Sequence, residues 1–330
     1  MTSLLKKKTL TALFWSFVEG MGLRGVQFVV GIILARLLLP EQFGLMGMLL
    51  IFMAVAQAFL DSGFSAALIQ RQDISQLDSS SAFFFNIVAG IITAGLLCFI
   101  APWIAKFYRE PILIPLIRFL SIGLVIGSFG MVQTAMMQKR IDFRTQAKIS
   151  LLASILSGII AVIFALQNYG VWSLAFHQVF LHLFRTILLW VFNSWRPSFE
   201  FSLESLRQMF GYSSRLLASK LLDTIFQHIY HAVIGRIYSS ALLGYYTRAR
   251  MLEQLPANTL SRMINSVTFP VFSTIQNDRA RVKRAVRKTL TTLALVNFPM
   301  MIGLALVAKP LVLLLLTEKW LPCVPYLQLM

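Results

Sequence analysis

The chain has 330 residues, of which 57% are hydrophobic and 13% charged, and its mean hydropathy is +0.73. Because soluble domains contain about 25% charged residues, this composition excludes a soluble globular protein and indicates a polytopic membrane protein. The net charge of +17 is compatible with nucleic-acid binding, but the Lys and Arg residues outside the apolar runs gather on alternate loops. This distribution follows the positive-inside rule, so we expect no nucleic-acid partner.

Nine apolar runs are long enough to cross a bilayer, which takes about 20 helical residues. A tenth run begins near Pro322. The basic residues gather before the first run, in Lys139–Lys148 and in Arg279–Lys288. The positive-inside rule therefore places these segments and the N-terminus in the cytoplasm. The predicted spans are Thr9–Arg36, Gln42–Ile69, Ser80–Phe107, Leu113–Gln138, Thr145–Leu166, Val171–Asn193, Met209–Arg236, Leu243–Thr274 and Thr289–Ala308.

The segment Asn193–Gln208 mixes polar and apolar residues and follows six spans, so it is the best candidate for a cytoplasmic linker. Segments of this kind commonly separate compact units. We therefore predict a six-helix N-terminal transmembrane lobe at residues 1–193, a linker at 194–208 and the start of a C-terminal lobe at 209–330.

The two lobes carry matching local patterns in the same order. Arg36 and Gly44 have the same separation as Arg236 and Gly244, and the residues around both pairs are similar. Such matches favour a duplicated six-span unit, which is a common plan of transporter folds. The second unit has three spans and the beginning of a fourth, so we expect it to be truncated.

Polar residues in several spans recur at helical spacing, so each set shares one helix face. Charged groups inside spans are costly in lipid and usually face a protein interior or a water-filled cavity. Cations outnumber carboxylates on these faces, which favours an anionic substrate such as a phosphate. Lys220 and Asp223 are near enough on one helix to form a pair. The candidate cavity cations are Arg24, Arg215, Lys220, Arg248, Arg250 and Arg262.

The remaining polar residues of these faces either balance the cations or carry protons or sodium ions during transport, and both roles stay open. Arg215, Arg248 and Arg250 lie near span ends, where reaching the membrane interface is an equal alternative. His228 and His231 have no carboxylate or thiol placed to complete a metal site, so we expect neither a metal nor a cofactor. The polar candidates are Glu19, Gln27, Asp61, Asp223, Glu253, Gln254 and Asn258.

The first hairpin carries a motif that is specific at the level of a family. Its residues Ile33–Pro40, Phe43–Leu45, Leu60–Phe64 and Ala67–Gln70 closely resemble the opening of bacterial Wzx-type polysaccharide flippases. These proteins belong to the multidrug/oligosaccharidyl-lipid/polysaccharide (MOP) exporter superfamily. The stretch Glu318–Pro322 is also similar to theirs, although the preceding position holds Thr where the family pattern leads us to expect Gly.

This resemblance implies an all-α, MATE-like fold of two six-helix lobes around a central cavity in the bacterial inner membrane. It implies translocation of an undecaprenyl-pyrophosphate-linked oligosaccharide by alternating access, for O-antigen, capsule or exopolysaccharide biosynthesis. Membrane lipids and the polysaccharide polymerase machinery are the implied partners. In relatives, basic residues of the first, seventh and eighth spans line the cavity, and these spans contain the six candidate cations.

There are two alternatives, one within the transporter class and one from another functional class. An ion-coupled drug exporter of the same superfamily is expected to have a cavity dominated by carboxylates, whereas Arg and Lys dominate here. A membrane polymerase or glycosyltransferase needs an aqueous segment for its chemistry, but the longest loop, Asn193–Gln208, has no paired carboxylates and no nucleophile–base set. We therefore expect a transporter that is not an enzyme.

Overall fold

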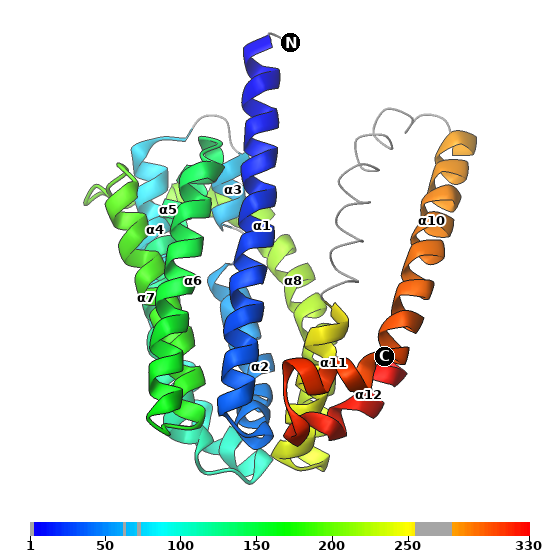
Figure 1. Ribbon diagram of the computed structural model, residues 1–330. Coiled ribbons are helices and arrows are strands. Elements are labelled where there is room, and N and C mark those ends of the chain that lie inside the picture. The colour runs from blue at the N-terminus through cyan, green and yellow to red at the C-terminus, as the bar shows by residue number, and fades with distance from the viewer. Residues whose placement is uncertain (1–2, 62–63, 71–73, 255–278) are drawn as a thin grey trace.

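The computed structural model describes residues 3–61, 64–70, 74–254 and 279–330, without the side chains of 3–14, 16–17, 64, 66, 209–213, 215 and 279–280. All regular structure within these ranges is helical, and the long helices run up and down between two ends (Figure 1). We call the end with the turns at Leu39 and Ser239 the hairpin end. The opposite end, which holds residues 193–202, is the linker end. Seven of the described helices are long and apolar enough to span a membrane.

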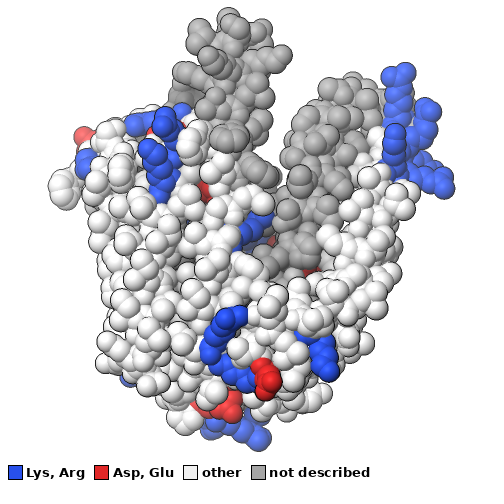
Figure 2. Space-filling view, viewed as in Figure 1, with Lys and Arg blue, Asp and Glu red and all other residues white. Residues whose placement is uncertain are grey.

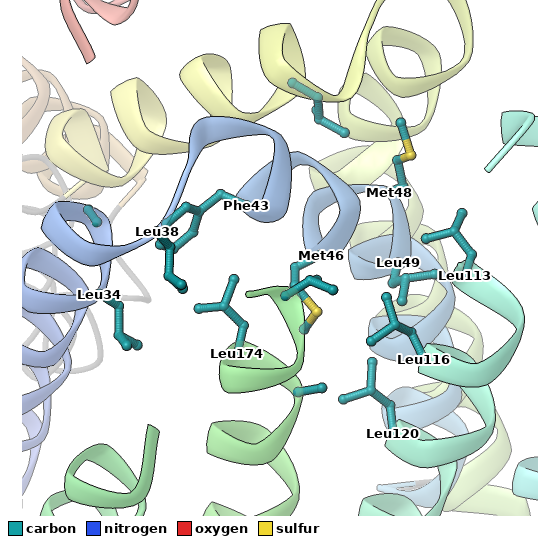
Figure 3. Packing of buried hydrophobic residues seen from close by; sticks show 14 of the residues in the cluster. Leu34, Leu38, Phe43, Met46, Met48, Leu49, Leu113, Leu116, Leu120 and Leu174 are labelled. Carbon is teal, nitrogen blue, oxygen red and sulfur yellow. The ribbon is translucent and has the colours of Figure 1, made fainter. Parts of the chain in front are cut away.

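The first six predicted spans all correspond to helices, which form one bundle. Helix α1 packs on α6, α4 packs on α5, and α7 packs on both α5 and α6. At the hairpin end, apolar side chains of α1, α2, α5 and α7 point toward one another and form the main core (Figure 3). The helices are α1 (Ser3–Leu37), α2 (Pro40–Leu60), α3 (Phe64–Gln70), α4 (Gln76–Tyr108), α5 (Leu113–Lys139), α6 (Phe143–Leu166) and α7 (Val171–Phe192).

The second predicted span is broken into two helices. Asp61 is the C-cap of α2, and its backbone N–H donates to the Gln57 carbonyl at 2.8 Å. The next helix begins at Phe64. Hydropathy predicted one continuous span because Asp61 is the single charged residue between Gln42 and Ile69, and one charge in a long apolar run does not lower its average enough.

The second half of the chain starts earlier than predicted. Ser202 caps α8, since its Oγ accepts from the Ser205 N–H at 3.3 Å, and an N-cap of this kind fixes a helix start. Residues from Leu203 onward are therefore helical, although the linker was predicted to reach 208. The elements are α8 (Leu203–Ile237), helical residues 240–254, α10 (Arg279–Leu306), α11 (Ala308–Leu315), the short 3₁₀ helix η1 (Glu318–Cys323) and α12 (Val324–Leu329).

Helix α10 also begins upstream of its predicted start at Thr289. Its first turns are rich in Arg and Lys, with exposed side chains that form a basic patch at the linker end (Figure 2). Hydropathy placed these turns in a loop because it registers apolar content, whereas a helix continues through basic residues of good helix propensity.

The two halves meet through reciprocal contacts at the hairpin end. Helices α1 and α8 each have 35 residues, and α2 and the helix beginning at 240 follow them after equal intervals. A Cβ added at Gly44 would overlap the carbonyl of Ser240, and one added at Gly244 would overlap the carbonyl of Pro40. Reciprocity of this kind is what a two-fold relation between similar units produces.

Residues 193–202 are held firmly against α4 and α5. Trp195 is buried, its Nε1 donates to Gln76 Oε1 at 3.0 Å, and its carbonyl accepts from Gln133 Nε2 at 3.1 Å. Farther along, the Ser202 N–H donates to Ser81 Oγ at 2.8 Å. The connection between the two halves is thus an ordered part of the first bundle.

Candidate substrate cavities

Two cavities that contain charged and polar side chains lie between the halves, and α2, α7 and α8 line both of them. We call the larger one, of 640 Å³, the hairpin-side cavity and the smaller one, of 370 Å³, the linker-side cavity. The chief polar residues of the hairpin-side cavity are Arg24, Gln27, His177, Gln178, Gln227, His228, His231, Arg248, Arg250 and Gln254. Those of the linker-side cavity are Gln57, Asp61, Thr134, Gln138, His182, Arg185, Thr186 and Lys220.

The two cavities lie in series along the bundle. On α7, His177 lines the hairpin-side cavity and Arg185 lines the linker-side cavity. On α8, which runs in the opposite direction, Lys220 lines the linker-side cavity and His231 lines the hairpin-side cavity. With a helical rise of about 1.5 Å per residue, the centres of the two linings are about 15 Å apart along the helices. A ligand that crosses the bundle between α2, α7 and α8 therefore meets both cavities.

The hairpin-side cavity is cationic. Arg24 reaches it from α1, and Arg250 reaches it from the helix 240–254 of the other half. The guanidinium of Arg250 donates to the Tyr246 hydroxyl at 3.0 Å, and no Asp or Glu occurs among the described residues of the lining. A cavity in which cations from two halves converge without a carboxylate is suited to an anion.

Arg248 has a structural role in the wall of this cavity. Its side chain is 8% exposed, and its guanidinium lies over the Phe43 ring at 3.8 Å from the centroid, with the Trp320 ring at 6.0 Å. An aromatic face stabilises a buried guanidinium through a cation–π contact. Arg248 therefore joins the two halves by stacking, and it does not reach the membrane interface.

The linker-side cavity contains an ion pair between the halves. Lys220 of α8 pairs with Asp61 at the end of α2, and Asp61 also accepts from Gln57 Nε2 at 3.1 Å. The predicted pair of Lys220 with Asp223 is wrong, because Asp223 accepts instead from Gln227 Nε2 at 2.8 Å. Spacing along one helix could not reveal a carboxylate that a different helix brings to the same lysine.

The sequence matches the model of a protein family described as "Polysaccharide biosynthesis protein" over residues 33–325. It is 30% identical to the teichuronic acid biosynthesis protein TuaB of Bacillus subtilis (strain 168), over 99% of this chain and 68% of the relative. It is 29% identical to the lipopolysaccharide biosynthesis protein WzxC of Escherichia coli (strain K12), over 99% of this chain and 67% of the relative. The chain belongs to the polysaccharide biosynthesis protein family.

The fold is also that of a known flippase. The structure matches lipid II flippase MurJ in an inward closed conformation with a TM-score of 0.72, at 13% identity, over 96% of this chain and 71% of the other. The predicted all-helical MOP fold and the resemblance to Wzx-type proteins are confirmed. This family member is a multi-pass bacterial membrane protein. It is also 28% identical to the succinoglycan biosynthesis transport protein ExoT of Rhizobium meliloti (strain 1021), over 100% of this chain and 67% of the relative, in line with the expectation of a transporter that is not an enzyme.

The structure brings some of the predicted site residues together and separates others. Arg24, Gln27, Arg250 and Gln254 share the hairpin-side cavity, as does Arg248, whereas Lys220 and Asp61 line the linker-side cavity. A single central cavity was predicted, whereas the described residues line two separate cavities.

The other predicted residues have different positions. Glu19 accepts from Ser150 Oγ of α6 at 2.8 Å, and Glu253 is half-buried but is not among the described lining of either cavity. Arg262, Asn258 and the side chain of Arg215 lie outside the described residues.

Helix α7 contributes residues that the sequence analysis missed. Gln178, His182 and Arg185 line the two cavities. Their spacings of four and three residues place them on one helix face, the same signal that identified the face of α1. The polar faces predicted from spacing belong to spans one, two, seven and eight, and the same signal in span six was missed.

Proposed function

We propose that this chain translocates a lipid-linked oligosaccharide, joined to undecaprenyl pyrophosphate, across the bacterial inner membrane for the synthesis of a surface polysaccharide. The observation that carries the proposal is the convergence of Arg24 and Arg250 in a cavity with no carboxylate among its described lining residues. A guanidinium binds phosphate oxygens through two parallel hydrogen bonds, so two of them from opposite halves match a pyrophosphate.

The same cavity also provides partners for sugars. Gln27, Gln178, Gln227 and Gln254 lie around the two arginines, and amide side chains both donate to and accept from hydroxyl groups. The names of the relatives TuaB and WzxC refer to teichuronic acid and lipopolysaccharide, which are surface polymers, and this supports a glycan head group. Polymerases that extend such polymers are the partners we expect on the far side of the membrane.

Alternating access supplies the movement. The basic residues outside the spans gather at the linker end, so the positive-inside rule places that end and the N-terminus in the cytoplasm. The halves are closed at the hairpin end by contacts such as Trp320 with Ala35. Rocking of the two halves would open this end and expose the bound head group to the periplasm. The carboxylates that we propose for coupling this motion to H⁺ or Na⁺ are Glu19, Asp61, Asp223 and Glu253.

The test replaces the genomic copy in the source bacterium with the Arg24→Gln/Arg250→Gln variant. We expect surface polysaccharide to be lost and its lipid-linked precursor to accumulate, while the protein remains at normal levels in the membrane. Arg207→Gln is the matched control, because Arg207 is exposed on α8 and lines neither cavity. Normal polysaccharide from the double variant would refute the proposal.

A drug exporter of the same superfamily is the second candidate. Its cationic substrates would be repelled by Arg24 and Arg250, since like charges in a confined site raise the free energy of binding. A transport assay with a cationic dye in membrane vesicles separates the two functions, and we expect no uptake above that of vesicles without the protein.

A further inference from the structure

Arg185 of α7 is a half-buried charge inside a membrane span, without a strong partner among the described residues. Within the described part of the chain it makes no ion pair and no hydrogen bond, although the carboxylates of Glu19 and Asp61 act on it electrostatically. It lines the linker-side cavity together with Lys220 and His182. A cation held inside a membrane protein at this cost is explained most simply by an anion that binds beside it.

The ion pair in the same cavity is easily exchanged. The Lys220 side chain is 45% exposed and that of Asp61 34% exposed, and ion pairs with this exposure contribute little stability. A phosphate with more than one negative charge can therefore displace Asp61 from Lys220. When the phosphate leaves, the carboxylate returns and no unpaired lysine remains.

The position of the linker-side cavity determines which of the two cavities a ligand reaches first. It is nearer to the linker end than the cavity of Arg24 and Arg250, and it lies on the same three helices about 15 Å away. A head group that enters from the linker end reaches Lys220 and Arg185 before it reaches Arg24.

We infer that the linker-side cavity is a separate binding station for a phosphate-bearing head group, where Arg185 and Lys220 bind the anion and Asp61 competes with it for Lys220. The direction of travel rests on the proposed function, whereas the binding itself does not. The carboxylate limits the affinity of this station, so the head group is not trapped before it reaches the cavity of Arg24 and Arg250.

The experiment titrates the purified full chain in detergent with sodium pyrophosphate at constant ionic strength, by isothermal titration calorimetry. Asp61→Asn removes the competitor, so we expect about fivefold tighter binding at this station. Arg185→Gln and Lys220→Gln each remove a charge-assisted contact and should weaken it about tenfold or more. Arg207→Gln on α8 is the control and should bind as the native chain does.

The gain of affinity in Asp61→Asn protects the test from misfolded variants, because an unfolded protein would not bind more tightly. If Asp61→Asn binds no more tightly than the native chain, competition by the carboxylate is refuted. If Arg185→Gln/Lys220→Gln retains the native stoichiometry and affinity, the station does not exist.

The double variant Arg24→Gln/Arg250→Gln separates this inference from the proposed function. We expect it to lose one pyrophosphate site and to keep the one that depends on Arg185. Loss of all binding in this variant would leave the cavity of Arg24 as the sole phosphate site and overturn the station alone. Normal surface polysaccharide with the Arg185 site intact would overturn the proposed function alone.

A last titration tests whether the phosphate bound at this station belongs to a transported head group or to an ordinary anionic lipid. The titration is repeated in phosphatidylcholine nanodiscs with and without phosphatidic acid. Because the charged side chains of Asp61, Arg185 and Lys220 line this cavity between the halves, we expect the same pyrophosphate affinity in both. Competition by phosphatidic acid would assign the station to an ordinary anionic lipid and would contradict its role for a transported head group.

Discussion

The indole Nε1 of Trp320 donates a hydrogen bond to the backbone carbonyl of Ala35 at 2.8 Å. The Trp320 side chain is fully buried, and its ring packs against Phe43 with a centroid distance of 5.4 Å. Beside it, Arg36 Nε donates to the Leu315 carbonyl at 2.9 Å, and Lys319 Nζ donates to the Arg36 carbonyl at 2.7 Å. These contacts make the hairpin end the closed end of the structure.

Trp320→Phe should weaken this closure without removing the aromatic packing. The variant leaves the Ala35 carbonyl without its partner in a buried position, which costs about 1–3 kcal/mol. We expect a cysteine placed at Leu38 to react faster with a membrane-impermeant maleimide in this variant. Trp103→Phe is the matched control, because Trp103 is 56% exposed on α4. Unchanged labelling would show that the indole hydrogen bond does not hold the hairpin end shut.

Gly44→Ala and Gly244→Ala should each disrupt the crossing of the two halves. A methyl group at either position overlaps a carbonyl of the opposite half, and such overpacking costs about 1–3 kcal/mol. A lower midpoint of thermal unfolding in detergent is the expected result for both. Gly95→Ala is the control, since nothing lies within 4 Å of the added Cβ, and it should leave the midpoint equal or higher.

Thr317→Gly should stabilise the protein. Thr317 has φ 89° and ψ 171°, a combination that is essentially restricted to glycine and costs other residues about 1–3 kcal/mol. Relief of this strain should raise the thermal midpoint. Asn168→Gly serves for comparison, because Asn168 has φ 62° and asparagine tolerates that conformation. A drop in the midpoint of Thr317→Gly would mean that the threonine side chain contributes more than its backbone strain costs.

Arg248→Lys should lower stability although the charge is kept. A lysine ammonium cannot stack flat on an aromatic ring as the guanidinium does on Phe43, and we expect a loss of about 1 kcal/mol. Arg236→Lys is the comparison, since exposed Arg236 lies 5.1 Å from the Phe107 ring centroid and should show a smaller change in thermal midpoint. Equal changes in the two variants would argue against a structural role for Arg248.

Much of the fold follows from hydropathy alone. Apart from the break after Asp61 and the earlier start of α1, the first six spans were placed within a few residues. Their apolar runs are long and the turns between them are short, as at Leu39 and Gly170. The start of α8 was misplaced because a serine cap, and no change in hydropathy, begins that helix at Leu203.

The site was predicted less completely than the fold. Helical spacing identified Arg24 and Gln27 as one face, and both line the hairpin-side cavity. Helical spacing could not predict the ion pair between Lys220 and Asp61. These residues are far apart in sequence, and only the packing of α2 against α8 brings them together. The division into two cavities is likewise a property of the packed helices, which no single span displays.

The segment 193–202 has a consequence for the way the two halves move. Its anchors at Gln76, Ser81 and Gln133 all belong to α4 or α5, so it travels with the first bundle as one body. Any rotation of α8 relative to the first bundle is then confined to the residues around Ser202. The connection itself stays fixed, and a hinge lies at its end. A flexible insert before Ser202 would release this hinge from α4 and α5. The movement of α8 would then no longer be coupled to the first bundle.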